Sequence, residues 1–128
     1  MIPVGAKAES RLKVSEEDTA LAWGSGSLPV LATPRMILMV EATAMQCLAP
    51  YMEEGRTSVG TLVDVAHVSA SPVGSEVVCN VEVVEVDRAR IRFRVSVTDA
   101  FGDVGTGFHE RFVVSAEKFM AKADSKSS

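Results

Sequence analysis

Several features that would place a protein in a particular class are scarce in this 128-residue sequence. Its 13 lysines and arginines against 17 aspartates and glutamates provide no basic field for nucleic acid. Its two cysteines, Cys47 and Cys79, are too few for a disulfide framework and lack metal-ligand spacing. No apolar run approaches the roughly 18 residues of a membrane span, and the N-terminus lacks signal-peptide character. We therefore expect a reduced, cytoplasmic protein that binds neither nucleic acid nor a membrane.

Motifs of several enzyme classes are also absent. The sequence has no G-x-S-x-G nucleophile elbow, no phosphate loop, no G-x-G-x-x-G after an expected strand, and no cluster of histidines and cysteines. Serine hydrolase, nucleotidase and metalloenzyme functions are not favoured, and we expect no metal or separate cofactor.

The length suits a single domain, residues 1–128, with one core. Thr33 as N-cap, Pro34 at the first helical position and Pro50 beyond the end predict a helix over about 34–49. Apolar residues at 36–40 cover every side of its beginning, so other structure must surround it. Extended segments are expected at about 6–14, 18–23, 58–70, 75–86, 90–99 and 104–114, and a disordered tail from about 121.

The pairing of two of these segments follows from their apolar pattern. The odd-numbered residues Val77 to Val83 match the odd-numbered residues Ile91 to Val97, which requires an odd-length connection in an antiparallel pair, such as a three-residue loop at 87–89. Glu82 then shares a face with the arginines at 90, 92 and 94, which we interpret as surface ion pairing. In the last strand, the expected apolar side comprises Val104, Phe108, Phe112 and Val114.

One surrounded helix between early extended segments and a four-strand meander predicts an α+β hotdog fold, in which an antiparallel sheet wraps a long central helix. Because one sheet cannot cover a helix that is apolar on nearly all sides, we expect a homodimer, which could pair further into a tetramer.

Glu41 is the most informative single residue. Leu38, Met45 and Leu48 surround it at helical spacing, so it is expected on a face with core residues. A buried carboxylate must be partnered, protonated or part of a site, and a structural ion pair with an arginine of the sheet is the alternative to a catalytic role.

Two further residues could act with Glu41. His67 continues the strand row of Thr61, Val63 and Val65, and it could be catalytic or a core histidine bonded to the backbone. Thr33 could simply cap the helix or stabilise an oxyanion at its N-terminus. Eight helical residues separate Thr33 from Glu41 by about 12 Å, so the chain must bend or a second subunit must help.

In the stretch GTGFHERFV, His109, Glu110 and Arg111 follow two glycines, Gly105 and Gly107. Gly105 and Gly107 remove side chains from the face that His109 and Arg111 share, so another group could approach the backbone there. Arg111 could bind a phosphate, or these residues could form a solvated charged face.

From Leu31 to Lys122 the sequence resembles the hotdog-fold thioesterases related to fluoroacetyl-CoA thioesterase. The matching words are LATPRM, MVEATAMQCLAPYMEEG, SVGTLVDVAHVSASPVG, GTGFHERFVV and EKFMAK. The family uses a threonine, a glutamate eight residues later and a histidine 26 residues after that, which fall here on Thr33, Glu41 and His67.

The resemblance implies hydrolysis of a small acyl-CoA at a site between two subunits, with coenzyme A as part of the substrate. His67 and the helix N-terminus would polarise the thioester carbonyl, Thr33 would join this network, and Glu41 would be a nucleophile or general base. Gly60 would give backbone access beside the acyl group, and Arg111 would help to hold the phosphates. Leu31 and Met36 would shape the pocket.

One departure from the family concerns the segment before Thr33. The fluoroacetyl enzyme has phenylalanines there as a hydrophobic lid, whereas this sequence reads GSGSLPVLA. A general short-chain acyl-CoA thioesterase is therefore favoured over a fluoroacetyl-selective one. Alternatives within the same fold are a non-catalytic acyl-CoA or lipid-binding module and a hydratase or dehydratase of acyl thioesters.

Overall fold

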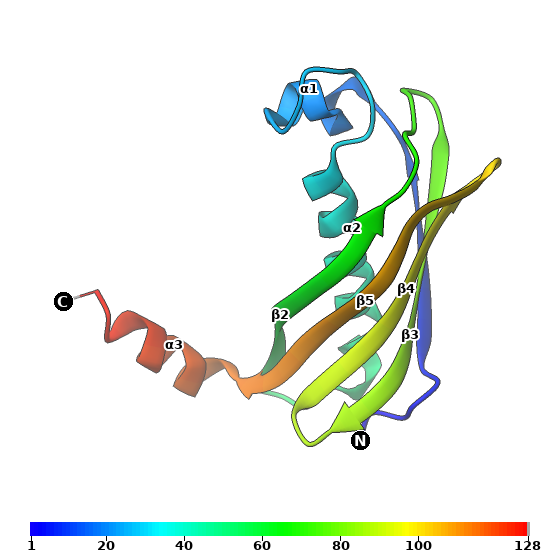
Figure 1. Cartoon of the computed structure of the whole chain (residues 1–128). Coiled ribbons are helices and arrows are strands. Elements are labelled where there is room, and N and C mark those ends of the chain that lie inside the picture. Colours follow the sequence, from blue (N-terminus) through cyan, green and yellow to red (C-terminus); the bar gives the residue numbers. More distant parts are fainter. Residues whose placement is uncertain (128) are drawn as a thin grey trace.

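The computed structural model describes residues 1–127 and shows a five-stranded antiparallel sheet curved around one long helix (Figure 1). The helices and 3-10 turns are η1 (Glu16–Asp18), α1 (Ala20–Trp23), α2 (Thr33–Leu48), η2 (Ala49–Tyr51) and α3 (Ala116–Asp124). The strands are β1 (Lys7–Lys13), β2 (Arg56–His67), β3 (Glu76–Asp87), β4 (Arg90–Asp99) and β5 (Gly102–Ser115). Their order across the sheet is β1-β3-β4-β5-β2. This is the expected hotdog architecture, with β2 at one edge of the sheet.

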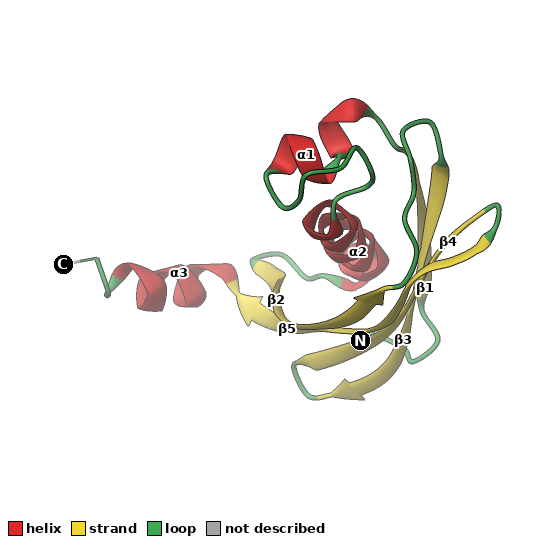
Figure 2. Cartoon of the chain, turned by 45° about the horizontal axis from the view of Figure 1, so that its top comes forward, coloured by secondary structure: helices red, strands yellow, loops and turns green. Residues whose placement is uncertain are grey.

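The core lies between α2 and the concave face of the sheet (Figure 2). The helix buries one side of its surface, and the expected odd-numbered rows of β3 and β4 face it, as their burial confirms. The buried residues of α2 are Met36, Met39, Val40, Thr43, Ala44, Cys47 and Leu48. Each large apolar side chain removed from water here contributes about 1.5–3 kcal/mol, so this interface fixes the helix on the sheet. Within residues 1–127, no helix is both long and apolar enough to cross a membrane.

The connection between β3 and β4 differs from the expected three-residue loop. Asp87 pairs with Arg90, which leaves a two-residue turn with Arg88 at a φ of 58°. A register shift between Val83 and Glu85 restores the matching of the odd-numbered rows farther along the hairpin. The predicted faces are therefore confirmed, while the loop prediction is wrong because a β-bulge supplies the extra residue.

Helix α2 begins one residue earlier than expected. Ala32 is the N-cap and makes no side-chain capping bond, and Thr33 is the first helical residue. The predicted capping role of Thr33 is therefore wrong, and its hydroxyl is available for another partner. The helix ends at Leu48, before the 3-10 turn that contains Pro50.

Two segments adopt helices that the sequence did not suggest. The extended segment expected at 18–23 is wrong, because Ala20–Trp23 form a helical turn that Thr19 caps and Gly24 ends in the left-handed conformation. The disordered tail expected from residue 121 is wrong for residues 121–124, because they belong to α3. Ser128, the last residue of that predicted tail, lies outside the described residues. Helix α3 leads away from the sheet (Figure 2).

The outer face of β5 carries residues that were expected in the core. Val104 is buried, but Phe108 packs under the Arg92 guanidinium, 4.3 Å from its ring centroid, and Phe112 is exposed. A register shift between Val97 and Thr98 changes the side of the sheet that each later residue of β5 occupies. The expected apolar side of β5 is therefore wrong beyond Val104.

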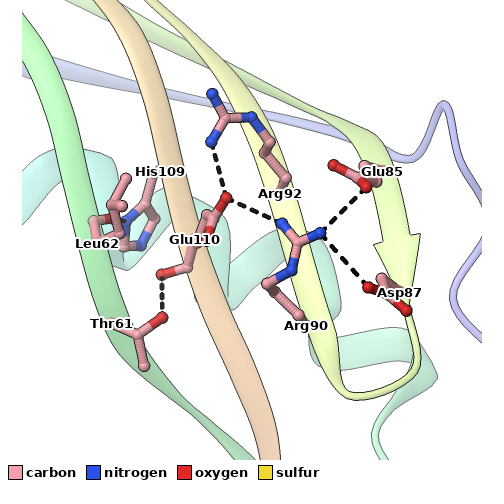
Figure 3. A network of polar contacts seen from close by, with 8 residues as sticks. All are labelled: Thr61, Leu62, Glu85, Asp87, Arg90, Arg92, His109 and Glu110. Carbon is pink, nitrogen blue, oxygen red and sulfur yellow. Dashed lines mark hydrogen bonds and ion pairs between the residues drawn. The ribbon is translucent and has the colours of Figure 1, made fainter.

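The arginines of β4 pair with partners other than the one expected. Arg90 and Arg92 donate to Glu110 at 3.0 and 2.7 Å, and Arg90 also reaches Glu85 and Asp87 (Figure 3). The hydrogen bond from Arg92 lowers the pKa of Glu110 despite some loss of hydration. Glu82 lies opposite Arg94 in the register but belongs to no ion pair of the described chain, so its predicted role is wrong.

Candidate active site

The sheet surface beneath one side of α2 is polar and rich in glycine. Residues that face each other in an antiparallel pair share a side of the sheet, so the partners of β2 and β5 define this surface. The inward residues are Ser58, Gly60, Val63, Val65 and His67 on β2, and Gly105, Gly107, His109, Arg111 and Val113 on β5. The row predicted from Val63 to His67 is confirmed, and Thr61 is displaced at the bulge between Gly60 and Leu62.

Thr33 and His67 meet at the N-terminal end of α2. Thr33 Oγ1 lies 2.7 Å from His67 Nδ1, although 34 residues separate them in sequence. The N–H groups of Thr33 and Arg35 make no hydrogen bond within the described chain, so the free donors of the first helical turn lie beside this pair. The predicted association of threonine, histidine and helix terminus is therefore present in one chain.

A cleft of about 340 Å³ opens beside this pair. It is lined by Ala20, Ser25, Val30, Leu31, Thr33, His67, Val68, Ser69 and Ala70. Burial lowers the pKa of His67 below its ordinary 6.5, although a hydrogen bond with the Ser69 backbone opposes this shift. A neutral imidazole beside an exposed hydroxyl can accept or relay a proton at neutral pH. Within the described chain, His67 Nε2 is buried without a hydrogen-bond partner.

Glu41 lies farther along α2, on its partly exposed side. Its side chain is 40% exposed, and its neighbours Leu38 and Met45 are 47% and 50% exposed. The expectation that Glu41 shares a core face is therefore wrong within one chain, although Leu48 is buried. The residues around the carboxylate form an apolar stripe that no part of the described chain covers.

The predicted ion pair of Glu41 with an arginine of the sheet exists, and the arginine is Arg111. Arg111 Nη1 lies 3.7 Å from Glu41 Oε2, and the arginine side chain is only 5% exposed. Burial lowers the pKa of Arg111, and the attraction of Glu41 opposes this shift. Arg111 and His109 are buried, so the alternative of a solvated charged face is wrong for both. The guanidinium points inward at Glu41, and none of its contacts supports the expected role with phosphates.

Glycines allow side chains of the helix to reach the sheet. A Cβ on Gly60 would lie 2.6 Å from Glu41 Oε2, and a Cβ on Gly105 would lie 2.7 Å from Met36 Sδ. Gly107 has a φ of 152°, and a Cβ there would overlap the backbone of Asp64 on β2. The nearest group at each of these glycines thus belongs to α2 or β2 of the same chain.

The structure gives Leu31 and Met36 different positions. Leu31 is buried, lines the cleft beside Thr33 and donates its N–H to the Ser71 carbonyl. Met36 is buried against Gly105 and does not line that cleft. Of these two residues, only Leu31 lines the cleft, whereas Met36 packs on the sheet surface at Gly105.

Two contacts near the site were not expected from the sequence. Arg35 Nε donates to Asp18 Oδ1 at 2.9 Å, and the Asp18 carbonyl accepts from Ala32 N–H, which joins the α1 segment to the first turn of α2. Ser58 binds Arg111 from the adjacent strand. The S-x-x-D pattern at Ser15 could have indicated Asp18 as part of a capping box, but no local pattern indicated Ser58.

The site can therefore supply free backbone donors, a histidine with a hydroxyl partner, and an ionisable carboxylate held beside a buried cation. Donors at a helix terminus stabilise a developing oxyanion, and a carboxylate can attack a carbonyl or activate water. Among residues 1–127, no group of three or more His, Cys, Asp or Glu side chains is placed to hold a metal ion. This combination suits acyl transfer from a thioester.

Comparisons with known proteins agree with this chemistry. Residues 14–117 match the family of the fluoroacetyl-CoA-specific thioesterase. Fluoroacetyl-CoA thioesterase from Streptantibioticus cattleyicolor is 39% identical over 97 residues, which cover 76% of this chain and 70% of that protein. A solved structure of the fluoroacetyl-CoA thioesterase superposes with a TM-score of 0.91 at 32% identity over 98% of both chains.

A more distant structure shows the same fold. A thioesterase superfamily member from Thermus thermophilus superposes with a TM-score of 0.91 at 26% identity, over 99% of this chain and 94% of that one. The fold and these comparisons thus define a hotdog-fold enzyme that hydrolyses thioesters. More narrowly, the chain belongs to the family of the fluoroacetyl-CoA-specific thioesterase.

Proposed function

We propose that the protein hydrolyses a small acyl-CoA to a carboxylic acid and coenzyme A, with Thr33, Glu41 and His67 as its catalytic residues. The contact between Thr33 Oγ1 and His67 Nδ1 at the end of α2 carries the proposal, because it joins two distant residues beside free helical N–H groups. The family relatives that act on fluoroacetyl-CoA support a small acyl group. Coenzyme A enters as part of the substrate, and the reaction needs no other cofactor.

Two groups of residues take part in the reaction: Thr33 with His67 at the N-terminus of α2, and Glu41 with Arg111 farther along the helix. Water adds its oxygen to the thioester carbon, the C–S bond breaks, and the thiol leaves with a proton. His67, Thr33 and the helix N-terminus polarise the carbonyl, and Glu41 acts as the nucleophile or as the general base toward water. If Glu41 attacks first, water hydrolyses the resulting anhydride in a second step. Arg111, 3.7 Å from Glu41, holds the carboxylate in place in either case.

The distance along α2 supports a site shared by two subunits. Thr33 already belongs to the helix, so no bend before the first turn brings it toward Glu41, and about 12 Å of helix separates them. We therefore infer a homodimer in which Glu41 of one protomer acts with Thr33 and His67 of its partner. The exposed Leu38 and Met45 beside Glu41 support this inference, because association would bury them.

The segment before Thr33 supports a general short-chain substrate. Leu28 is 64% exposed, and Val30 and Leu31 line the cleft, in the segment for which the family resemblance implies a phenylalanine lid. Aliphatic side chains leave more room than phenylalanine rings and make no ring contacts. We expect acetyl and slightly longer acyl groups to be hydrolysed at comparable rates.

A panel of acyl-CoAs tests the reaction directly. Thiol release is followed with wild type and with Glu41→Ala, and the variant is expected to lose at least about a hundredfold in kcat. Equal rates in the two proteins would contradict the mechanism. Tight binding of acyl-CoA without turnover by wild type would instead indicate a binding module.

Hybrid dimers test whether the site is shared. Glu41→Gln and His67→Ala are assembled together, and each parent alone is expected to be inactive. If Glu41 acts with the partner's His67, each hybrid contains one intact site, so random assembly restores about a quarter of the wild-type activity. If the mixture is no more active than its parents, each site is built within one chain and the inference is wrong.

A further inference from the structure

We propose that Ser58 and His109 are positioning residues that hold Arg111 against the Glu41 carboxylate. The proposal deepens the proposed function, since it assigns to the inner faces of β2 and β5 the orientation of a catalytic group. Neither residue reaches the cleft beside Thr33. Both act through the Arg111 guanidinium, which lies between them and Glu41.

The contacts of His109 define its tautomer. Nδ1 lies 2.8 Å from the Leu62 carbonyl oxygen, which can only accept a hydrogen bond, so Nδ1 carries the proton. Nε2 lies 3.3 Å from Arg111 Nη1, which can only donate, so Nε2 accepts. Full burial lowers the pKa of His109, and the charge of Arg111 acts in the same direction, against the opposing effects of the Leu62 hydrogen bond and of the Glu41 and Glu110 carboxylates. The ring is therefore neutral and joins the β2 backbone to the guanidinium.

Ser58 holds the other side of the same guanidinium. Arg111 Nε donates to Ser58 Oγ at 2.8 Å, and Nη2 donates to the Ser58 carbonyl at 3.0 Å. All three nitrogens of the guanidinium thus have partners on β2 or β5. A planar group bound on three sides cannot rotate without losing charge-assisted hydrogen bonds. Arg111 is consequently a fixed charge, while Glu41 has a flexible and partly exposed side chain.

The space above Gly60 shows that these groups converge. A Cβ at this position would lie 2.6 Å from Glu41 Oε2, 3.3 Å from Arg111 Nη1 and 3.5 Å from His109 Cε1. Glu41 therefore approaches the sheet where Arg111 is held. The groups that face the carboxylate are Arg111 and His109 from β5, because Glu110 points to the outer face and binds Arg90 and Arg92 (Figure 3).

If His109 served only in packing, kcat would respond differently to substitutions of this residue. Its ring stacks on Phe93 with centroids 6.0 Å apart, and this contact needs no hydrogen-bond acceptor at Nε2. The positioning role depends on that acceptor. Two substitutions separate the functions: the amide N–H of asparagine can replace the Nδ1 donor, while the amide oxygen of glutamine can replace the Nε2 acceptor.

The test compares His109→Asn and His109→Gln in thiol release, with thermal unfolding measured for both. We expect His109→Asn to lower kcat about tenfold to a hundredfold with little change in KM, and His109→Gln to restore most of the loss. If the kcat of His109→Gln exceeds that of His109→Asn by more than about fivefold, the positioning role is supported, and a smaller ratio overturns it. The neighbouring outward variant Glu110→Gln controls for general disturbance of β5.

Ser58→Ala provides a second test if His109→Asn does not fold. It removes Oγ but keeps the backbone carbonyl, so kcat is expected to fall about tenfold at unchanged KM. A wild-type kcat in this variant overturns the proposal. Failure of the proposed function would be seen separately, in the acyl-CoA panel. Either wild type would release no thiol, or Glu41→Ala would release thiol as fast as wild type.

Discussion

Gly60→Ala tests the placement of Glu41 with the smallest possible change. The added Cβ would lie 2.6 Å from Glu41 Oε2, and ordinary contact begins at 3.4 Å, so the carboxylate must move by about 0.8 Å. The same methyl group would also crowd Arg111 Nη1 at 3.3 Å. The substitution therefore acts directly on the pair of charges that the mechanism requires.

The expected loss of activity is large, and the expected loss of stability is small. Displacing a reacting group by about 1 Å costs up to a hundredfold in rate, or about 2.7 kcal/mol of transition-state stabilisation. The displaced atoms of Glu41 are the end of a flexible, partly exposed side chain, so the fold can accommodate the methyl group. Alanine also reduces the conformational entropy of the unfolded chain. This effect stabilises the variant by about 0.4–1 kcal/mol and offsets part of any loss in the free energy of unfolding.

The assay combines kcat for thiol release with the midpoint of thermal unfolding. Gly105→Ala is the matched comparison, because its Cβ would lie 2.7 Å from Sδ of the fully buried Met36. Crowding in the core costs about 1–3 kcal/mol, so this variant should lose stability first. A Gly60→Ala protein with wild-type kcat would refute the role of Glu41. One that loses as much stability as Gly105→Ala would show that the methyl group meets more than the movable end of Glu41.

Three further predictions concern the Asp18–Arg35 ion pair, the histidines and the interface. Asp18→Asn weakens the ionic bond to Arg35, so we expect a loss of about 2 kcal/mol in unfolding free energy and earlier proteolysis before α2; an unchanged midpoint would contradict this. Burial lowers the pKa of His67 and His109, so the unfolded chain binds protons first as the pH falls below 6.5. The unfolding midpoint should drop between pH 7 and 5, with a shallower slope in His109→Gln, and a flat profile would exclude the effect. Leu38→Lys places a charge on the exposed stripe of α2 and should yield inactive monomers in sedimentation velocity; an active dimer would locate the interface elsewhere.

Local patterns were sufficient for much of the fold. Pro34 and Pro50 delimited α2 to within one residue, because proline constrains a helix wherever it occurs. The alternating apolar residues of β3 and β4 predicted both buried rows, because side chains alternate along any strand. The isolated Glu41 was visible in the sequence pattern, and the resemblance to a thioesterase family linked it with Thr33 and His67 before any contact was known.

The register between paired strands could not be inferred in this way. The expected apolar side of β5 was wrong because a bulge reversed the side of the sheet that Phe108 and Phe112 occupy, and the bulge forms only when β5 pairs with β4. The sequence also left open whether His109 and Arg111 are solvated, and the structure shows that both are buried.

The sequence alone determined which residues had the right chemistry, since a carboxylate within an apolar helix and a histidine on an apolar strand row are visible without coordinates. Only the tertiary structure decided their partners. Thr33 meets His67 and Glu41 meets Arg111 because β2 pairs with β5 beneath α2. Such contacts depend on sheet register and helix placement, which are set by the burial of the whole core and by no single segment.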